Sequence, residues 1–161
     1  PFFGISLGMQ CAIIDIARNL CKLKGANSTE FHLDTPHPVL DLMLEEKGIS
    51  RRADAMRLGS YPCDIIPDTK AYKAYGKETI KERHRHRYEV NASYLDQLKA
   101  AGLMVTGRCA QNNWVEIIEL KGHRWFLGTQ FQPEFKSRPN RPHPLFREFV
   151  LAAEKYKKAM A

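Results

Sequence analysis

Hydrophobic residues recur along this chain with two different periods, and each period predicts a different element. A short apolar stretch at 1–5 predicts a buried strand. From Gly8 to Leu20 apolar residues fall three and four positions apart, which predicts a helix, and because its other positions are also largely apolar we expect burial nearly all round. Ala92–Ala101 has the same helical period and stops at Gly102, a normal helix end.

The second half of the chain has the shorter period of strands. Three strand-like runs are separated by Asn112-Asn113 and by Gly122: Leu103–Cys109, Trp114–Leu120 and Trp125–Phe131. A proline-rich loop then leads to a last amphipathic helix that carries Leu145 and Phe149 on one face. The weaker patterns predict a short helix at Pro38–Glu46, strands within Ala55–Ile66 broken by Gly59 and Pro62, and a short helix at Lys70–Tyr75.

Length and composition bound the class of protein. With 161 residues, 43% of them hydrophobic and 27% charged, the chain is one ordinary globular domain. No run of about 18 apolar residues is present, and we expect no membrane association. The four cysteines lack CxxC or metal-like spacing, which favours reduced, buried thiols in a cytoplasmic protein without a bound metal.

The net charge of +7 raises the question of nucleic-acid binding. The excess is spread along the chain apart from one dense stretch at 81–87 and a basic tail, and net charge alone does not indicate specific binding. No aromatic-interleaved platform or recognition helix accompanies it, so nucleic acid is not an expected partner. The alternating His84 and His86 indicate an ion-paired or solvated strand rather than a metal site, because supporting carboxylates are not adjacent.

Two motifs carry candidate chemistry. Residues 4–8 read Gly-Ile-Ser-Leu-Gly, the small-x-nucleophile-x-small pattern of a sharp strand-to-helix turn that exposes Ser6. Residues 130–135 read Gln-Phe-Gln-Pro-Glu-Phe. Two positions along a strand share a face, so Glu134 is predicted to hold the side chain at Gln132. The Leu7 N–H, at the start of the following helix, is a natural donor to an oxyanion.

These motifs, with Asn27–Phe31, Met56–Cys63, Arg85–Asn91 and Lys136–Pro139, resemble the class I glutamine amidotransferases, and among them the glutaminase domain of CTP synthase. The resemblance covers essentially all of 1–161. It implies a flavodoxin-like α/β layered fold with a mixed, mostly parallel sheet. Because the chain starts on the elbow strand, we expect 1–161 to be the C-terminal portion of such a domain, with its N-terminal part missing.

The resemblance also assigns roles to single residues. Ser6 matches the nucleophile, which is Cys in the family, and Gln132 matches the base, which is His, with Glu134 as its carboxylate partner. Leu7 and Gln10 match positions that hold the glutamine substrate. Glu30 matches the acid that binds its ammonium group, and Arg87 the arginine near its carboxylate. No metal is implied in this domain.

The family reaction forms a glutamyl thioester and ammonia, and the ammonia then aminates UTP in a separate synthetase domain that uses ATP and Mg. The implied partners are therefore L-glutamine, a synthetase domain of the same parent chain, and further copies in a homotetramer. A serine without a base cannot perform the first step efficiently, because a carboxamide does not accept a proton at neutral pH. We expect an intact scaffold with an inactive triad.

Two other interpretations remain open at the level of sequence. Gly-Ile-Ser-Leu-Gly could be the G-x-S-x-G of a serine hydrolase, in which case His123 or His143 would be the late histidine. Alternatively the domain is non-catalytic and binds glutamine as a regulatory module, through Gln10, Glu30 and Arg87. Under any of these interpretations, the first one included, Gln132 could be a structural amide bonded to Glu134.

Overall fold

The computed structural model describes residues 1–42 and 56–160. Its first elements in chain order are β1 (Phe2–Ile5), α1 (Leu7–Asn19), β2 (Asn27–Ser28), β3 (Pro38–Asp41), β4 (Arg57–Ile65), α3 (Lys70–Tyr75), β5 (Thr79–His86) and β6 (Glu89–Val90). The remaining elements are the 3₁₀ turn η2 (Ala92–Tyr94), α4 (Leu95–Ala100), β7 (Leu103–Cys109), β8 (Val115–Leu120), β9 (Phe126–Thr129), the 3₁₀ turn η3 (Pro133–Phe135) and α5 (Pro144–Met160).

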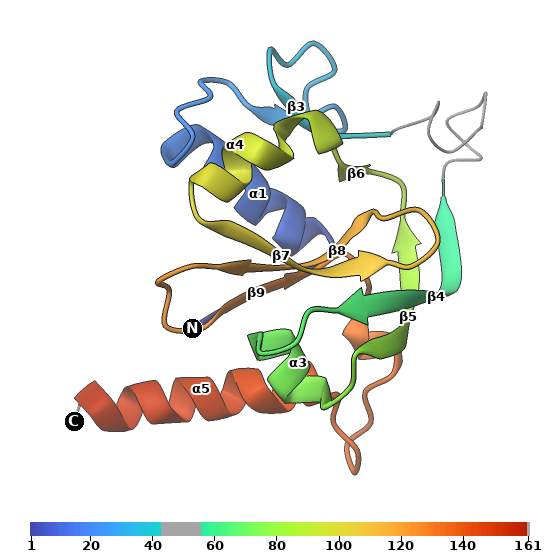
Figure 1. Cartoon of the computed structure of the whole chain (residues 1–161), viewed down its shortest axis with the longest axis vertical. Coiled ribbons are helices and arrows are strands. Elements are labelled where there is room, and N and C mark those ends of the chain that lie inside the picture. Colours follow the sequence, from blue (N-terminus) through green and yellow to red (C-terminus); the bar gives the residue numbers. More distant parts are fainter. Residues whose placement is uncertain (43–55, 161) are drawn as a thin grey trace.

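A six-stranded sheet in the order β1-β9-β8-β7-β4-β5 forms the centre of the described part of the chain (Figure 1). The α/β class and the mixed sheet are confirmed. The expectation of a mostly parallel sheet is wrong for these residues, because β1–β9 is the one parallel neighbour pair and the other four pairs are antiparallel. Short turns join β7 to β8 and β8 to β9, and a short turn can connect only antiparallel neighbours.

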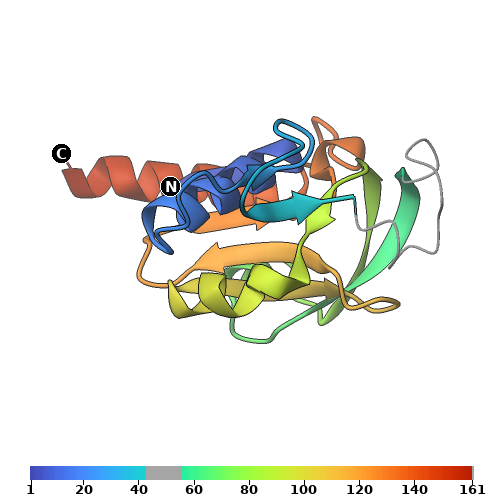
Figure 2. The same cartoon turned by 90° about the horizontal axis from the view of Figure 1, so that it is seen from above.

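Helices cover both faces of this sheet and enclose two hydrophobic cores (Figures 1 and 2). One core lies under α1 and α4 and includes the fully buried Met9, Ile13 and Leu98. The other lies under α3 and the start of α5 and includes Phe131 and Leu145. The sheet is thus the middle layer of three, and the segment that carries Ser6 lies at the carboxyl end of its only described parallel pair.

Several predicted elements need correction. Pro38–Asp41 is strand β3 in a small second sheet with β2 and β6, not the start of a helix, and the rest of the predicted helix lies largely outside the described residues. The predicted break at Pro62 is absent: β4 is continuous, and because β7 pairs only with Cys63 and the two residues after it, Pro62 has no ladder partner on that side. Ala55 lies outside the described residues.

Two burial predictions were also only partly right. Helix α1 buries seven of its thirteen residues, and Cys11 lies on its exposed side, so it is not buried all round. Cys63 and Cys109 are buried as expected, and all four cysteines are free. Within residues 1–42 and 56–160, no helix has the length and apolar character needed to cross a membrane, and no cluster of three or more potential metal ligands is found.

Candidate active site

Ser6 occupies a strained turn between β1 and α1. Its φ of 47° and ψ of −104° lie in a region that residues with a side chain rarely adopt, at a cost of about 1–3 kcal/mol. The Ser6 N–H donates to the Thr129 carbonyl at 2.6 Å, and the Ser6 carbonyl accepts from the Gln10 N–H at 3.0 Å. The strand end and the first turn of the helix therefore both fix this conformation.

Gly4 and Gly8, the two glycines of the Gly-Ile-Ser-Leu-Gly motif, differ in the space around their Cα atoms. A Cβ on Gly4 would lie 2.8 Å from the carbonyl carbon and oxygen of Gly8, so only glycine lets β1 and α1 approach this closely. A Cβ on Gly8 would meet nothing within 4 Å. Gly4 is required by backbone packing, whereas Gly8 leaves open space beside Ser6.

The amide of Gln132 reaches Ser6 from the far end of the sequence. Its Nε2 donates to the Ser6 Oγ at 3.2 Å, although the two residues are 126 positions apart. The same Nε2 donates to the Arg85 carbonyl at 2.9 Å, while Oε1 accepts from the Arg85 N–H at 2.8 Å. The buried Gln132 side chain is thus bonded to the backbone of β5 at both ends of its amide.

This pair of hydrogen bonds to Arg85 decides which end of the amide faces Ser6. If the amide were turned over, its oxygen would face the Arg85 carbonyl and its nitrogen would face the Arg85 N–H, and both hydrogen bonds would be lost. The end near Ser6 is therefore the NH₂ group, a donor. Its acceptor oxygen is already used by Arg85, so Gln132 offers nothing that can take the hydroxyl proton of Ser6.

Glu134 does not hold the side chain at position 132, and that prediction is wrong. Pro133 starts the 3₁₀ turn η3, in which residues two positions apart point to different sides, unlike in a strand. Glu134 is exposed, and among the described residues it forms no hydrogen bond or ion pair. Gln132 is a structural amide, but its partner is Arg85.

A cavity of about 260 Å³ opens next to Ser6. We call it the Ser6 cavity, and its lining residues are Ser6, Leu7, Gln10, Glu30, Met56, Arg85, His86, Arg87 and Tyr88. The structure thus places all four predicted substrate residues around one opening beside the elbow. Glu30 and Arg87 are exposed at this opening and bring opposite charges to it.

Two buried amides hold the turn that carries Arg87. The Nε2 of Gln10 donates to the Tyr88 carbonyl at 3.2 Å, and the Nε2 of Gln130 donates to the same oxygen at 3.3 Å. Gln10 comes from α1 and Gln130 follows β9, so helix and sheet both fix this turn. The resemblance predicted that Gln10 lies at the substrate. The role of Gln130 was not predicted, because the Tyr88 carbonyl that it contacts is 42 positions away in the sequence.

A buried ionic cluster lies behind the same turn. Arg57 contacts Glu89 at 3.3 Å and Glu116 at 2.8 Å, and His86 contacts Glu89 at 2.9 Å. Burial raises the pKa of Glu116 to about 8, because removal from water outweighs the attraction of Arg57. His84, also buried, has its pKa lowered to about 2, first by burial and then by Arg57.

The alternation along β5 explains this arrangement. His84 and His86 point inward and are buried, while Arg83 and Arg85 are exposed. His86 Nε2 lies 2.9 Å from Glu89, and the lowered pKa of His84 keeps its ring neutral, so the ion-paired strand stays a prediction. The carboxylates near these histidines lie on β6 and β8, where sequence adjacency gave no indication of them.

The geometry does not assemble a serine-hydrolase triad. His123 is exposed at the turn before β9, and His143 is buried against Glu82 and Tyr75. Neither residue lines the Ser6 cavity. The histidine that does line it, His86, points its Nε2 at Glu89.

Comparison with known proteins identifies the family. The model of the family "Glutamine amidotransferase class-I" matches residues 1–152. The chain belongs to the class I glutamine amidotransferase family. The glutamine amidotransferase chain is also 58% identical to a CTP synthase of Pelotomaculum thermopropionicum over 99% of its own length, and 55% identical to one of Syntrophus aciditrophicus over 100% of its length. It spans about 30% of the length of either relative.

A solved structure supports the same assignment of fold. The Trypanosoma brucei CTPS glutaminase domain with bound acivicin matches this amidotransferase chain with a TM-score of 0.87 and 37% identity. The match covers 96% of this chain and 60% of the solved one. The layered arrangement around the Ser6 cavity is therefore that of the class I amidotransferase fold.

Proposed function

We propose that this chain is the glutaminase part of a CTP synthase, that its Ser6 cavity binds L-glutamine, and that the chain as written does not hydrolyse it. The observation that carries the proposal is the orientation of the Gln132 amide, which donates to Ser6 Oγ. Where the family has a thiol and an imidazole, this site has a hydroxyl and a donor that cannot remove its proton. The similarity to CTP synthases supports glutamine as the ligand.

The expected loss of activity is large. Without general-base help a reaction of this type slows by about 10²- to 10⁴-fold. Loss of one member of a hydrolase triad can cost about 10⁶-fold, and since the members act as a unit the two losses are not added. Either figure leaves little or no measurable turnover.

Binding of glutamine requires neither a nucleophile nor a base, and the cavity retains charged groups that suit this ligand. The Arg87 guanidinium is suited to the substrate carboxylate and the Glu30 carboxylate to the substrate ammonium. The first N–H groups of α1, beginning with Leu7, point out of the helix at the elbow, where an amide oxygen is polarised in the family reaction.

The wider role is proposed on the same similarity. In a full-length protein an active version of this domain supplies ammonia to a synthetase domain of the same chain, which aminates UTP with ATP and Mg. We propose a cytoplasmic homotetramer, with the domain 1–161 acting as the C-terminal portion of the amidotransferase unit. No cofactor is assigned to the domain itself.

Two measurements on the chain as written test the proposal. Titration calorimetry with L-glutamine is expected to give saturable heat, and an ammonia-release assay is expected to give no turnover above the uncatalysed rate. Arg87→Met removes a charge-assisted contact, and we expect glutamine binding at least about tenfold weaker. Arg83→Met is the matched control, since Arg83 is exposed on β5, four residues before Arg87, and does not line the cavity.

The outcomes separate the two halves of the proposal. Turnover of glutamine by the unmodified chain would refute the inactive site. Absence of binding, or equal binding by the Arg87→Met and Arg83→Met variants, would refute the assignment of the cavity.

A further inference from the structure

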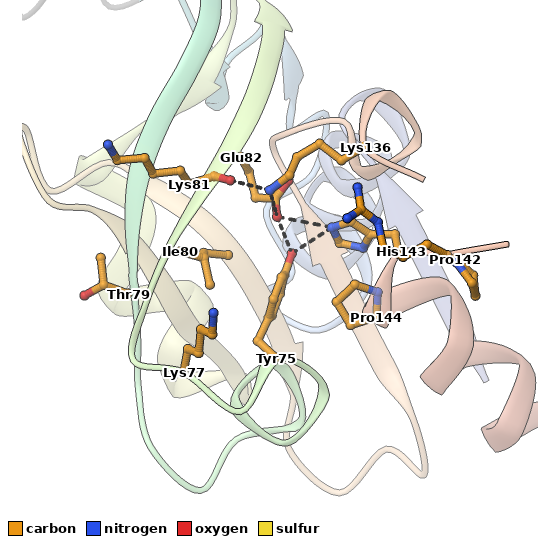
Figure 3. Close-up of a pocket in the computed structure, with 11 residues that line it drawn as sticks. Tyr75, Lys77, Thr79, Ile80, Lys81, Glu82, Lys136, Pro142, His143 and Pro144 are labelled. Carbon is orange, nitrogen blue, oxygen red and sulfur yellow. Dashed lines mark hydrogen bonds and ion pairs between the residues drawn. The ribbon is translucent and has the colours of Figure 1, made fainter. Parts of the chain in front are cut away.

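A second and larger cavity lies away from Ser6, between β5 and the loop that leads into α5 (Figure 3). It has a volume of about 480 Å³. We call it the Tyr75 cavity, and its lining residues are Tyr75, Lys77, Thr79, Ile80, Lys81, Glu82, Lys136, Arg141, Pro142, His143 and Pro144. None of them lines the Ser6 cavity, so the two openings are separate sites.

The floor of the Tyr75 cavity is a buried carboxylate with three partners. Glu82 is 1% exposed, and its Oε1 lies 3.2 Å from the Tyr75 hydroxyl, 3.2 Å from His143 Nε2 and 3.0 Å from Lys136 Nζ. His143 Nδ1 accepts from the Leu145 N–H at 3.3 Å, so the ring proton is on Nε2 and points to Glu82. These contacts converge on one oxygen in Figure 3.

The hydroxyl group of Tyr75 at the floor is uncharged. Burial, followed by the nearby Glu82 charge, raises the pKa of Tyr75 far above its usual value, which keeps the hydroxyl a neutral donor. Lys136 supplies the positive charge that balances Glu82, and its Nζ is fixed further by the Lys81 carbonyl at 2.6 Å. The carboxylate at the floor is thus compensated before any ligand arrives.

The rim of the cavity is cationic and uncompensated. Lys77 and Arg141 are exposed, and within the described parts of the chain neither forms an ion pair with an acid. The side chain of Lys81 runs away from the floor in Figure 3, and this residue faces Lys136 through its backbone carbonyl. Glu82 is the one acidic residue among the eleven that line the cavity, and it is matched by Lys136. Two like charges at the rim of a concave surface concentrate a positive potential in it.

The walls between floor and rim are partly apolar. Ile80, Pro142 and Pro144 line the space together with the ring of Tyr75. The volume is about twice that of the Ser6 cavity, so it has room for more than a bare anion. A ligand that suits the site carries multiple negative charges at the rim and a compact organic body against the walls.

We propose that the Tyr75 cavity binds a small metabolite through a phosphate group, held by Lys77 and Arg141. A phosphate offers several strong acceptor oxygens, which match the ammonium group and the guanidinium of this rim. The proposal is independent of catalysis at Ser6, because no residue is shared between the cavities.

Binding is tested by NMR titration of the ¹⁵N-labelled chain with inorganic pyrophosphate, and in parallel with orthophosphate and glucose 6-phosphate. We expect saturable shifts of the amides in 75–82 and 136–144, without comparable shifts at the elbow residues 6–10. Tighter binding of glucose 6-phosphate than of orthophosphate would assign a role to the apolar walls. Citrate, which has similar charge but no phosphate, is expected to bind more weakly, and equal binding of citrate and pyrophosphate would overturn the phosphate assignment.

A double variant, Lys77→Ala with Arg141→Ala, identifies the residues. Both side chains are exposed, so the fold is expected to persist, and binding of pyrophosphate should weaken at least about tenfold. Lys121→Ala, at an exposed turn outside the cavity, is the control and should bind as the parent does. Absence of saturable binding to the parent, or unchanged binding by the folded double variant, would overturn the proposal.

Discussion

Substitution of Gln132 by glutamate tests the orientation of its amide most sharply, because the two side chains have the same shape. Glutamate replaces the NH₂ group by an oxygen that faces the Arg85 carbonyl, where 2.9 Å now separates donor and acceptor. The contact with Ser6 persists, since the hydroxyl can turn and donate. The contact with Arg85 becomes one between two acceptors.

The structure sets the size of the effect. One hydrogen bond is lost, worth about 1 kcal/mol, and a part-buried carbonyl is left unpaired at a cost of about 1–3 kcal/mol. We expect Gln132→Glu to lower the free energy of unfolding by about 2–4 kcal/mol near pH 7. For a domain of this length each kcal/mol lowers Tm by about 2–4 °C, so the fall should be about 4–16 °C.

The deficit should depend on pH in a defined direction. Repulsion by the Arg85 carbonyl disfavours the charged form, so the pKa of the new carboxyl is raised in the folded state above its unfolded value. When the carboxyl introduced at position 132 is protonated, its O–H can donate to the Arg85 carbonyl as the amide does. The variant should therefore approach the parent below about pH 4, the ordinary range for this group, and lose stability as pH rises through the folded-state pKa.

Urea or thermal denaturation of parent and variant from about pH 3.5 to about pH 8 measures both effects. Gln111→Glu is the control, since Gln111 is exposed in the turn between β7 and β8 and should change stability little. A Gln132→Glu variant that is as stable as the parent at neutral pH, or one whose deficit is the same at every pH, would refute the assigned orientation.

Two further predictions concern the elbow and the buried cluster. Gly4→Ala should destabilise the fold by about 1–3 kcal/mol or more, because its Cβ meets backbone at 2.8 Å, whereas Gly8→Ala should fold normally; comparable Tm values for the two variants would contradict the close packing of β1 on α1. Glu116 binds its proton more tightly when folded, so its contribution to stability is complete below about pH 4.5 and is lost as pH rises toward 8. Between these pH values the free energy of unfolding of Glu116→Gln, measured by denaturation, should depend less on pH than that of the parent. An unchanged slope of unfolding free energy against pH would exclude Glu116 as the source of this pH dependence.

The local parts of the fold could be predicted from the sequence. The strand at 2–5, the helix that begins at Leu7, and the strands β7, β8 and β9 follow from periodicity and turn residues within one stretch of chain. Pro38–Asp41 was predicted wrongly because its strand state depends on β2 and β6, which are distant in the sequence. The antiparallel pairing of β7, β8 and β9 follows from the short turns that join them, whereas the resemblance had suggested a mostly parallel sheet.

The local features of the candidate site could also be predicted from the sequence, whereas its contacts between distant segments could not. Ser6 could be placed by motif, since an elbow is a local feature, and the resemblance named Gln10, Glu30 and Arg87, which line the cavity beside it. The partner of Gln132 could not, because it is the backbone of Arg85, and backbone groups leave no mark in the sequence. Glu134 was assigned to the wrong face because Pro133 begins a 3₁₀ turn where a strand was expected.

The central claim is that a hydroxyl facing an amide donor has replaced a nucleophile facing a base. The most direct measurement is ammonia release from L-glutamine by the chain as written, by Ser6→Cys, by Gln132→His and by the double variant, in the full-length context proposed above. We predict turnover at least about 10²-fold above background for the double variant alone. Turnover by the chain as written, with a glutamyl adduct on Ser6 detected by mass spectrometry, would contradict the account, as would a folded, glutamine-binding double variant that releases no ammonia.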